Sequence, residues 1–152
     1  MVAPYVVDFK LDFNTLMLGL LNNDNGKALT SSQVEFGTVS TNDGVNNSKV
    51  TVTAIGDNPN KGTTVITYNR VDMNTLNVLP FEHETSGDYL TFAELLPLIN
   101  LHYGLELTVD DIVDANLPVP EQGAQEVVAL PIKSTHGVWL NGCNVTITKA
   151  AE

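Results

Sequence analysis

Residues 92–113, FAELLPLINLHYGLELTVDDIV, decide the plan of this chain, because an earlier stretch repeats their pattern. Apolar residues recur in this stretch at the spacing of one helix face, at Phe92, Leu95, Leu96, Ile99 and Tyr103. The earlier run has nearly the same spacing, at Phe13, Leu16, Met17, Leu20 and Leu21. Each run ends at a glycine, Gly26 or Gly104, and the two glycines are 78 residues apart. The pattern therefore predicts two amphipathic helices that end in the same way.

The start of the second helix depends on Pro97. If the helix begins after Thr91, with Glu94 completing a capping box, Pro97 lies beyond the first turn and should kink the helix. Alternatively, the regular helix begins near Leu95, and Pro97 then lies in its first turn. For the first helix, Asp12 is the type of residue that caps an N-terminus.

The sequence after each glycine is typical of the start of a short helix. A Thr is followed three residues later by Gln or Asp, the spacing of a capping box, and apolar residues flank the cap at the spacing of a hydrophobic staple. The matched pairs are Thr30–Gln33 and Leu29–Val34 in the first copy, and Thr108–Asp111 and Leu107–Ile112 in the second. Four matched roles favour an internal duplication over chance similarity.

Alternating sequences predict a β-hairpin after each short helix. In the first copy, residues 48–55 (SKVTVTAI) and 63–69 (TTVITYN) are strand-like and flank a turn-rich loop at 56–62. In the second copy, residues 126–132 (EVVALPI) predict a strand, with Pro131 near its end as expected at an edge or bulge.

Two further segments have strand character. Asn141-Gly142 predicts a tight hairpin turn between residues 138–140 and 143–148, because Asn-Gly favours two-residue turns. Residues 5–12 (YVVDFKLD) mix β-branched and aromatic residues and could form a first strand.

These elements predict an α+β fold built from two duplicated units, each with a helix, a short helix and a β-hairpin. The approximate repeats span residues 13–69 and 92–148, and residues 70–90 link them. Since each copy alone would bury little surface, we expect a single domain, residues 1–152, in which the copies pack around a shared core. Apolar residues of the linker could lay a strand across this core: Leu76, Val78, Leu79 and Phe81. The expected core positions include Leu20, Leu29, Ile99 and Leu107.

The composition argues against several classes of protein. Of the 152 residues, 43% are hydrophobic, which is enough for a packed interior. The 18 acidic and 7 basic residues give a net charge of −11, which disfavours nucleic-acid binding because phosphate neutralisation needs Lys and Arg. We interpret the acidic surface as a feature of solubility. No apolar run approaches the ~20 residues that span a membrane, and the N-terminus lacks the pattern of a secretory signal.

We expect no catalytic, cofactor-binding or metal residues, no cofactor and no enzymatic activity. Cys143 is the single cysteine, which excludes an internal disulfide and a Cys-based zinc site, and we interpret it as a small buried residue. His83 lies beside two glutamates, but no second histidine stands at helical or hairpin spacing, so we assign it to a solvated loop. His102 is interpreted as a boundary residue and His136 as a turn residue. Phosphate-binding glycine loops and the GxSxG elbow do not occur.

Two stretches have some features of a cation site. Residues 22–26 (NNDNG) lack the alternating acidic ligands and the later glutamate of a calcium loop, so we interpret them as a helix cap. Asp110, Asp111 and Asp114 lie within one turn, and because two of them can serve a helix N-terminus, a cation site is the lesser alternative. A platform of aromatic residues could bind a sugar, although isolated aromatics in strands are usually core: Tyr5, Tyr68, Phe81 and Trp139.

Two segments are similar to small virion structural proteins of tailed bacteriophages. Residues 92–114 (FAELLPLINLHYGLELTVDDIVD), followed by a Pro-containing loop and a hairpin with a Trp, resemble that group. The segments VTVTAIG and GTTVITYNRVD, within residues 50–72, resemble the same group. The resemblance covers nearly the whole chain and includes no catalytic signature. It implies a non-enzymatic subunit of the particle, such as a head decoration, collar, tail or fibre-associated protein.

From this resemblance we expect a virion protein that is assembled in the host cytoplasm and joins or decorates parts of the head, neck or tail. Its expected partners are other virion proteins and further copies of itself, as a homo-oligomer in the particle, with no nucleic acid and no membrane. The alternative is an adhesin-like or carbohydrate-binding module on a fibre or cell surface, which an exposed aromatic groove would favour.

Overall fold

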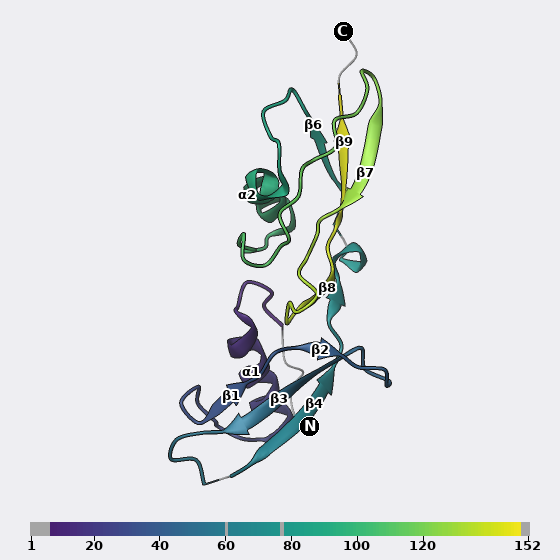
Figure 1. Cartoon of the computed structure of the whole chain (residues 1–152). Coiled ribbons are helices and arrows are strands. Elements are labelled where there is room, and N and C mark those ends of the chain that lie inside the picture. Colours follow the sequence, from purple (N-terminus) through teal and green to yellow (C-terminus); the bar gives the residue numbers. More distant parts are fainter. Residues whose placement is uncertain (1–6, 60, 77, 150–152) are drawn as a thin grey trace. The chain divides into compact units, whose positions relative to one another are not determined.

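The chain divides into two compact units at the boundary between Arg70 and Val71 (Figure 1). The computed structural model describes residues 7–59, 61–76 and 78–149. Each unit combines one α-helix with a small sheet, so the predicted α+β class is confirmed. The boundary falls at the start of the predicted linker, and a single domain with a shared core stays a prediction. No helix in the described ranges is long and apolar enough to cross a membrane.

The helix of the first unit, α1 (Phe13–Asn25), begins and ends where the sequence predicts. Asp12 caps it by accepting hydrogen bonds from the Thr15 amide at 3.1 Å and the Thr15 hydroxyl at 2.6 Å, and these bonds lower the pKa of Asp12. The helix ends at Gly26, whose φ of 57° lies in the left-handed region that glycine tolerates. Its buried face is carried by Leu16 and Met17. Leu20 packs against the core of this unit but is only partly buried, so the predicted burial is met only in part.

The sheet of the first unit is centred on β3, which pairs antiparallel with every other strand of that sheet. Val50 and Val52 of β3 are buried on the face toward Met17 and Val39, while alternate residues are exposed. The predicted hairpin is confirmed, with Val50 opposite Ile66. The strands are β1 (Val34–Phe36), β2 (Ser40–Thr41), β3 (Ser48–Ala54) and β4 (Thr63–Tyr68).

The second unit contains a three-stranded sheet in the order β6-β9-β7, with β6 parallel and β7 antiparallel to β9. A separate parallel pair joins β5 to β8. Part of the predicted linker is therefore built into this unit, and its Met73 and Phe81 are buried. The elements are β5 (Val71–Asp72), the 3-10 helix η1 (Met73–Thr75), β6 (Phe81–Glu84), β7 (Gln125–Ala129), β8 (Trp139–Asn141) and β9 (Asn144–Thr148).

The second helix, α2 (Phe92–Tyr103), begins directly after Thr91. Thr91 and Glu94 form the full capping box, and the Asp114 carboxylate accepts a further hydrogen bond from the Ala93 amide at 3.0 Å. Pro97 therefore lies beyond the first turn, which settles the alternative left open by the sequence. The predicted apolar face is buried at Phe92, Leu95, Leu96 and Ile99.

Both predicted short helices are instead single turns, which corrects the repeat unit. The Gln33 amide bonds the Thr30 carbonyl at 3.0 Å, and the Asp111 amide bonds the Thr108 carbonyl at 3.0 Å, but no helix follows either turn. The next residue enters β structure in both cases, as the start of β1 and as a bridge from Ile112 to Ile132. The backbone groups of the residues after each turn form hydrogen bonds with a neighbouring strand instead of with a helix. The capping-box pattern in the sequence therefore does not lead to a helix here.

The predicted hairpin turn at Asn141-Gly142 was wrong. The strands on its two sides pair with different neighbours, β8 with β5 and β9 with β6 and β7. Gly142 does not have the positive φ of a tight hairpin turn. The position requires a glycine because a Cβ atom there would overlap the carbonyl oxygen of Leu130.

The predicted first strand at residues 5–12 lies partly outside the described residues. Residues 7–12 form no strand and include a turn in which the Leu11 amide bonds the Asp8 carbonyl at 3.1 Å.

The same asparagine contact closes the end of both helices. In α2, the side-chain nitrogen Nδ2 of Asn100 donates to the backbone carbonyl of Leu107 at 2.7 Å. The backbone amide of Leu107 donates to the side-chain oxygen Oδ1 of Asn100 at 3.0 Å. In α1, Asn22 makes the same two bonds with Leu29 at 2.9 and 2.8 Å. We call each pair an asparagine clamp. Leu107 is buried, whereas Leu29 is only partly buried, so the core assignment of Leu29 was wrong.

A first prediction concerns the buried face of α2. Ile99 is fully buried and Leu101, two residues later on the same helix, is 81% exposed. Ile99→Ala should lower the free energy of unfolding by ~2–5 kcal/mol because it leaves a cavity. Leu101→Ala should change it by less than ~0.5 kcal/mol. Denaturant unfolding of both variants checks this, and equal losses would contradict the assignment of the helix face.

Candidate functional site

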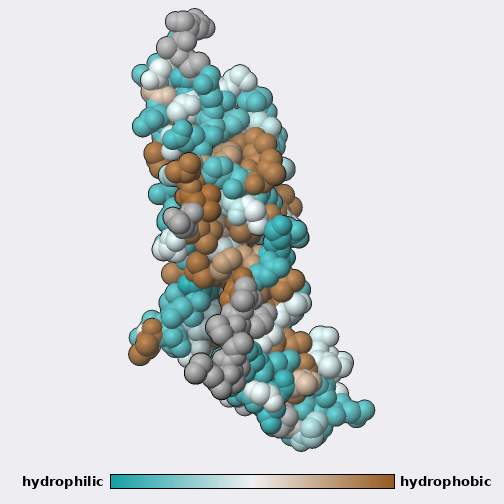
Figure 2. Space-filling view, turned by 180° about the vertical axis from the view of Figure 1, so that it is seen from behind, coloured by the Kyte–Doolittle hydropathy of each residue, from teal (hydrophilic) through white to brown (hydrophobic). Residues whose placement is uncertain are grey.

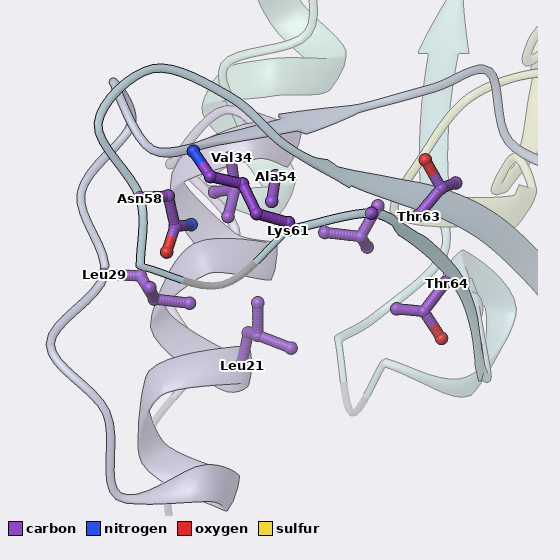
Figure 3. Close-up of a pocket in the computed structure, with 10 residues that line it drawn as sticks. Leu21, Leu29, Val34, Ala54, Asn58, Lys61, Thr63 and Thr64 are labelled. Carbon is purple, nitrogen blue, oxygen red and sulfur yellow. The ribbon is translucent and has the colours of Figure 1, made fainter.

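Two adjoining pockets lie in the first unit and share Leu21 of α1. The pocket of Figure 3, about 220 Å³, has mainly aliphatic walls from the helix, the segment after it and the sheet, at Leu21, Leu29, Val34, Val52 and Ala54. Asn58 and Lys61, from the loop before β4, also line it. The Asn58 side chain donates to the Gln33 carbonyl at 2.9 Å, which ties the loop to the start of β1.

The second pocket, about 420 Å³, lies between the last two turns of α1 and the end of β4. Its helix side has apolar Met17, Leu20 and Leu21 and polar Asp24 and Asn25, and its strand side has Ile66, Thr67 and Tyr68. We call the two pockets together the α1–β4 groove. The groove is open, and its walls are mostly apolar.

One wall of the groove is an edge strand. β4 pairs with β3 along six residue pairs, and the described strands include none on its other edge. Thr63, Val65 and Thr67 are exposed, while Ile66 and Tyr68 are half-buried. Such an edge offers backbone donors and acceptors to an added strand.

Tyr68, which lines the groove, has aromatic neighbours and lies near a buried arginine. Phe13 contacts Phe36 at 6.0 Å and Tyr68 at 6.2 Å between ring centroids. Burial raises the pKa of Tyr68 to about 12, and the nearby Arg70 charge opposes that rise. Arg70 is itself buried, and its Nε donates to the Ser48 hydroxyl at 2.6 Å. The phenol of Tyr68 is therefore neutral at physiological pH.

Two of the four rings of the sugar platform considered from the sequence, Phe81 and Trp139, are buried. Trp139 and Phe81 are buried in the second unit, whereas Tyr68 is half-buried in the first. Tyr5 lies outside the described residues. Rings that are buried cannot stack on a sugar, so Phe81 and Trp139 serve as core.

Two of the three histidines are packed against aromatic rings. His83 contacts Tyr89 at 5.1 Å between ring centroids, and its Nε2 lies 3.8 Å from the Asp88 carboxylate. His83 is mostly buried, so the predicted solvated loop was wrong; it belongs to β6. The ring of His102 packs edge-on against Phe81 and places Nε2 2.7 Å from the Leu79 carbonyl.

His136 and Asp111 form a pair that resembles part of a catalytic triad. The Nε2 atom lies 3.3 Å from an Asp111 oxygen, while Nδ1 accepts from the amides of Val138 and Trp139, each at 3.1 Å. The second Asp111 oxygen accepts from the amide and hydroxyl of Thr108. Both ring nitrogens of His136 therefore have partners within the chain, and the His136–Asp111 pair holds the turn before β8.

The acidic and amide-rich stretches have structural roles within the chain. Asp114 accepts a hydrogen bond at the start of α2, and Asp111 contacts His136. Of the three aspartates considered as a cation site, two therefore have structural roles, and only Asp110 does not have such a role here. Asn25 donates to the Leu21 carbonyl at 2.8 Å at the end of α1. The described residues include no group of three or more His, Cys, Asp or Glu able to hold a metal ion.

Cys143 is fully buried, as predicted. Burial raises the pKa of its thiol to about 11, and a hydrogen bond from Tyr103 acts in the opposite direction. The Tyr103 hydroxyl also accepts a bond from the Phe81 amide at 3.2 Å. A protonated, shielded thiol is a poor nucleophile.

The sequence did not point to the α1–β4 groove or to the asparagine clamps. A signal for the clamps was present, because Asn22 and Asn100 are 78 residues apart, like the glycines that follow them. The groove had no such local signal, since its lining comes from α1, β1, β3 and β4 together.

The profile of one protein family, described as "Family of unknown function (DUF7941)", matches residues 8–152. No curated protein and no solved structure matches the chain significantly.

A second prediction concerns Cys143 and alkaline pH. The thiol pKa rises from 9.0 to about 11 on burial, so the neutral form is favoured in the folded chain. Its contribution to stability is full below pH 9 and is lost as the pH rises through 11. Cys143→Ala should therefore show a shallower fall in the free energy of unfolding across this window. Denaturant unfolding at a series of pH values measures both curves, and parallel curves would show that the buried thiol has an ordinary pKa.

Proposed function

We infer that this chain, which belongs to the DUF7941 family, is a non-enzymatic structural subunit of a tailed-phage particle. In this role it decorates or joins parts of the head, neck or tail through protein–protein contacts. The observation that carries the proposal is the edge of β4, an exposed strand beside a mostly apolar groove. An edge of this kind adds a strand from another segment through backbone hydrogen bonds. The resemblance of residues 92–114 to phage virion proteins supplies the biological setting.

The surface of the chain supports a role in contacts between proteins. Figure 2 shows apolar side chains gathered in patches among hydrophilic ones on the face in view. Large apolar residues with more than half of their surface exposed include Val65, Leu79, Leu90, Leu101 and Val119. Contiguous exposed apolar surface is typical of interfaces. We therefore propose other virion proteins and further copies of the chain as partners, in the particle assembled in the host cytoplasm.

The polar groups that could suggest catalysis have structural partners. His136 and Asp111 hold a turn, and Cys143 is buried and protonated. This supports a non-enzymatic role. The alternative, a carbohydrate-binding module, has lost its predicted support, because Trp139 and Phe81 are core residues.

We further propose that the two units are copies of one ancestral unit. The asparagine clamps are 78 residues apart, and so are the bonds that follow them, Ile55 amide to Gln33 carbonyl and Lys133 amide to Asp111 carbonyl. The antiparallel strand pairs β3–β4 and β7–β9 also correspond, since Ser48 pairs with Tyr68 and Glu126 pairs with Ile147. The repeat unit is then a helix, a clamp, a turn and an antiparallel pair of strands.

A third prediction tests the role in the particle. Mass spectrometry of purified particles of the virus that encodes the chain should detect it in many copies per particle. Val65→Lys places a charge on the exposed face of β4 and should lower incorporation at least about tenfold, since burying an unpaired charge is costly. Val45→Lys, at a fully exposed loop residue, is the control and should be incorporated normally. Absence of the wild-type chain from the particles would refute the proposed function.

A fourth prediction concerns the net charge of −11. We propose that the chain lies on the outside of the particle, because its seven basic residues are scattered and cannot neutralise a run of phosphates. An affinity measurement at low salt should detect no binding to duplex DNA at micromolar concentrations. Tight binding that weakens steeply as salt rises would contradict this placement.

A further inference from the structure

We propose that the pocket of Figure 3 binds a small apolar carboxylate, with the apolar body of the ligand against the aliphatic walls and its carboxylate at Lys61. We call this site the Lys61 pocket. The proposal adds a binding site to the first unit and does not depend on the role in a virus particle. Three observations support it: the size and lining of the pocket, the charge of Lys61, and the burial of the matching positions in the second unit.

The Lys61 pocket has the size and lining of a site for a small apolar molecule. Its volume is about 220 Å³, and an apolar cavity of ~150 Å³ is already large enough to bind benzene. Val34 and Val52 in its walls are buried, whereas Leu21 and Leu29 are only partly buried. A ligand with an apolar body would remove the remaining surface of these leucines from water, which favours binding.

Lys61 adds a positive charge to this apolar site. Figure 3 shows its side chain extended along the pocket, between Asn58 on one side and Thr63 and Thr64 on the other. The ammonium group donates to the Gly56 carbonyl at 3.5 Å, which is a long bond. Among the residues that the structure describes, no Asp or Glu lies within ion-pair distance of it. A carboxylate head group would therefore complement this charge through a charge-assisted hydrogen bond.

The matching positions in the second unit belong to its core. At the repeat spacing of 78 residues, the aliphatic walls formed by Leu21, Leu29, Val34 and Val52 correspond to four buried residues, Ile99, Leu107, Ile112 and Leu130.

The second unit has an apolar side chain where the first has Lys61. The position 78 residues after Lys61 is Trp139, which is buried, and the spacing of 79 that relates β4 to β9 gives Leu140. The first unit therefore lacks apolar bulk that the second carries at this position, and a bound apolar molecule would supply it. This step uses the proposed duplication, whereas the pocket and its charge stand without it.

A ligand in the Lys61 pocket leaves the outer edge of β4 free for a partner strand. Thr64 lies directly opposite Val52 in the strand register, so the two side chains share one face of the sheet. Both residues line the pocket, which therefore lies on that face. The unpaired backbone groups of β4 lie in the plane of the sheet instead. The ligand and a partner strand on β4 thus use different groups.

Titration of the full-length chain with indolepropionate and tryptamine tests the proposal. The two probes share an indole ring, the ring of Trp139, and differ in the charge of the head group. Indolepropionate should bind saturably and should change the NMR chemical shifts of the backbone amides that line the pocket, such as those of Val34, Val52 and Ala54. Tryptamine should bind at least about tenfold more weakly, because its ammonium group faces that of Lys61.

Two pairs of variants separate charge from space. Lys61→Met keeps an unbranched apolar side chain without the charge and should weaken indolepropionate binding at least about tenfold. Lys49→Met, at an exposed position of β3 outside the pocket lining, is its control and should bind normally. Thr64→Trp, at an exposed position that lines the pocket, should abolish binding. Thr51→Trp, on the other face of the sheet, should not.

Three results would overturn the proposal: no saturable binding of indolepropionate, equal affinity for the two probes, or an affinity that does not respond to Lys61→Met. The comparison of the two probes uses the unaltered chain, so it decides even if a variant fails to fold. Incorporation into virus particles plays no part in these measurements, so this proposal and the proposed function can fail separately.

Discussion

The asparagine clamps are the contacts on which the plan of each unit depends. A helix that ends at a left-handed glycine leaves its last carbonyls and the following amides without helical partners. In α2, the Asn100 side chain bonds both the carbonyl and the amide of Leu107, so one side chain substitutes for a short piece of strand pairing. Each such hydrogen bond contributes ~0.5–1.5 kcal/mol net, and more is lost if the buried partner is left alone.

The direction of the chain after the clamp determines the arrangement of the sheet. The clamped Leu107 is followed by a single turn, which leads Ile112 into a bridge with Ile132, and Leu29 leads in the same way to β1 on β3. A pocket remains between α1 and β4 in the first unit. In the second unit, β6 pairs in parallel with β9.

The parts of the fold that the sequence predicted are those fixed by nearby residues. The caps at Asp12 and Thr91 and the glycine ends of both helices depend on contacts within four residues, and the hairpin of β3 and β4 follows from alternation. The errors arose where distant pairing decides the structure. The turns after Leu29 and Leu107 carry a helix signal that strand pairing overrules, and Gly142 is required by the position of Leu130 rather than by a turn. The groove could not be predicted because four elements form it.

Amide hydrogen exchange of Leu107 and Leu29 tests the role of the clamps most directly. Both amides lie in irregular segments, where exchange is usually fast, yet each donates to an asparagine oxygen. We predict slow exchange in the wild type, and an acceleration of at least about tenfold at Leu107 in Asn100→Ala and at Leu29 in Asn22→Ala. Asn14→Ala, at an exposed position of α1, should leave both rates unchanged. Fast exchange of these amides in the wild type, or rates that do not respond to loss of the asparagines, would contradict the claim that the clamps hold each unit together.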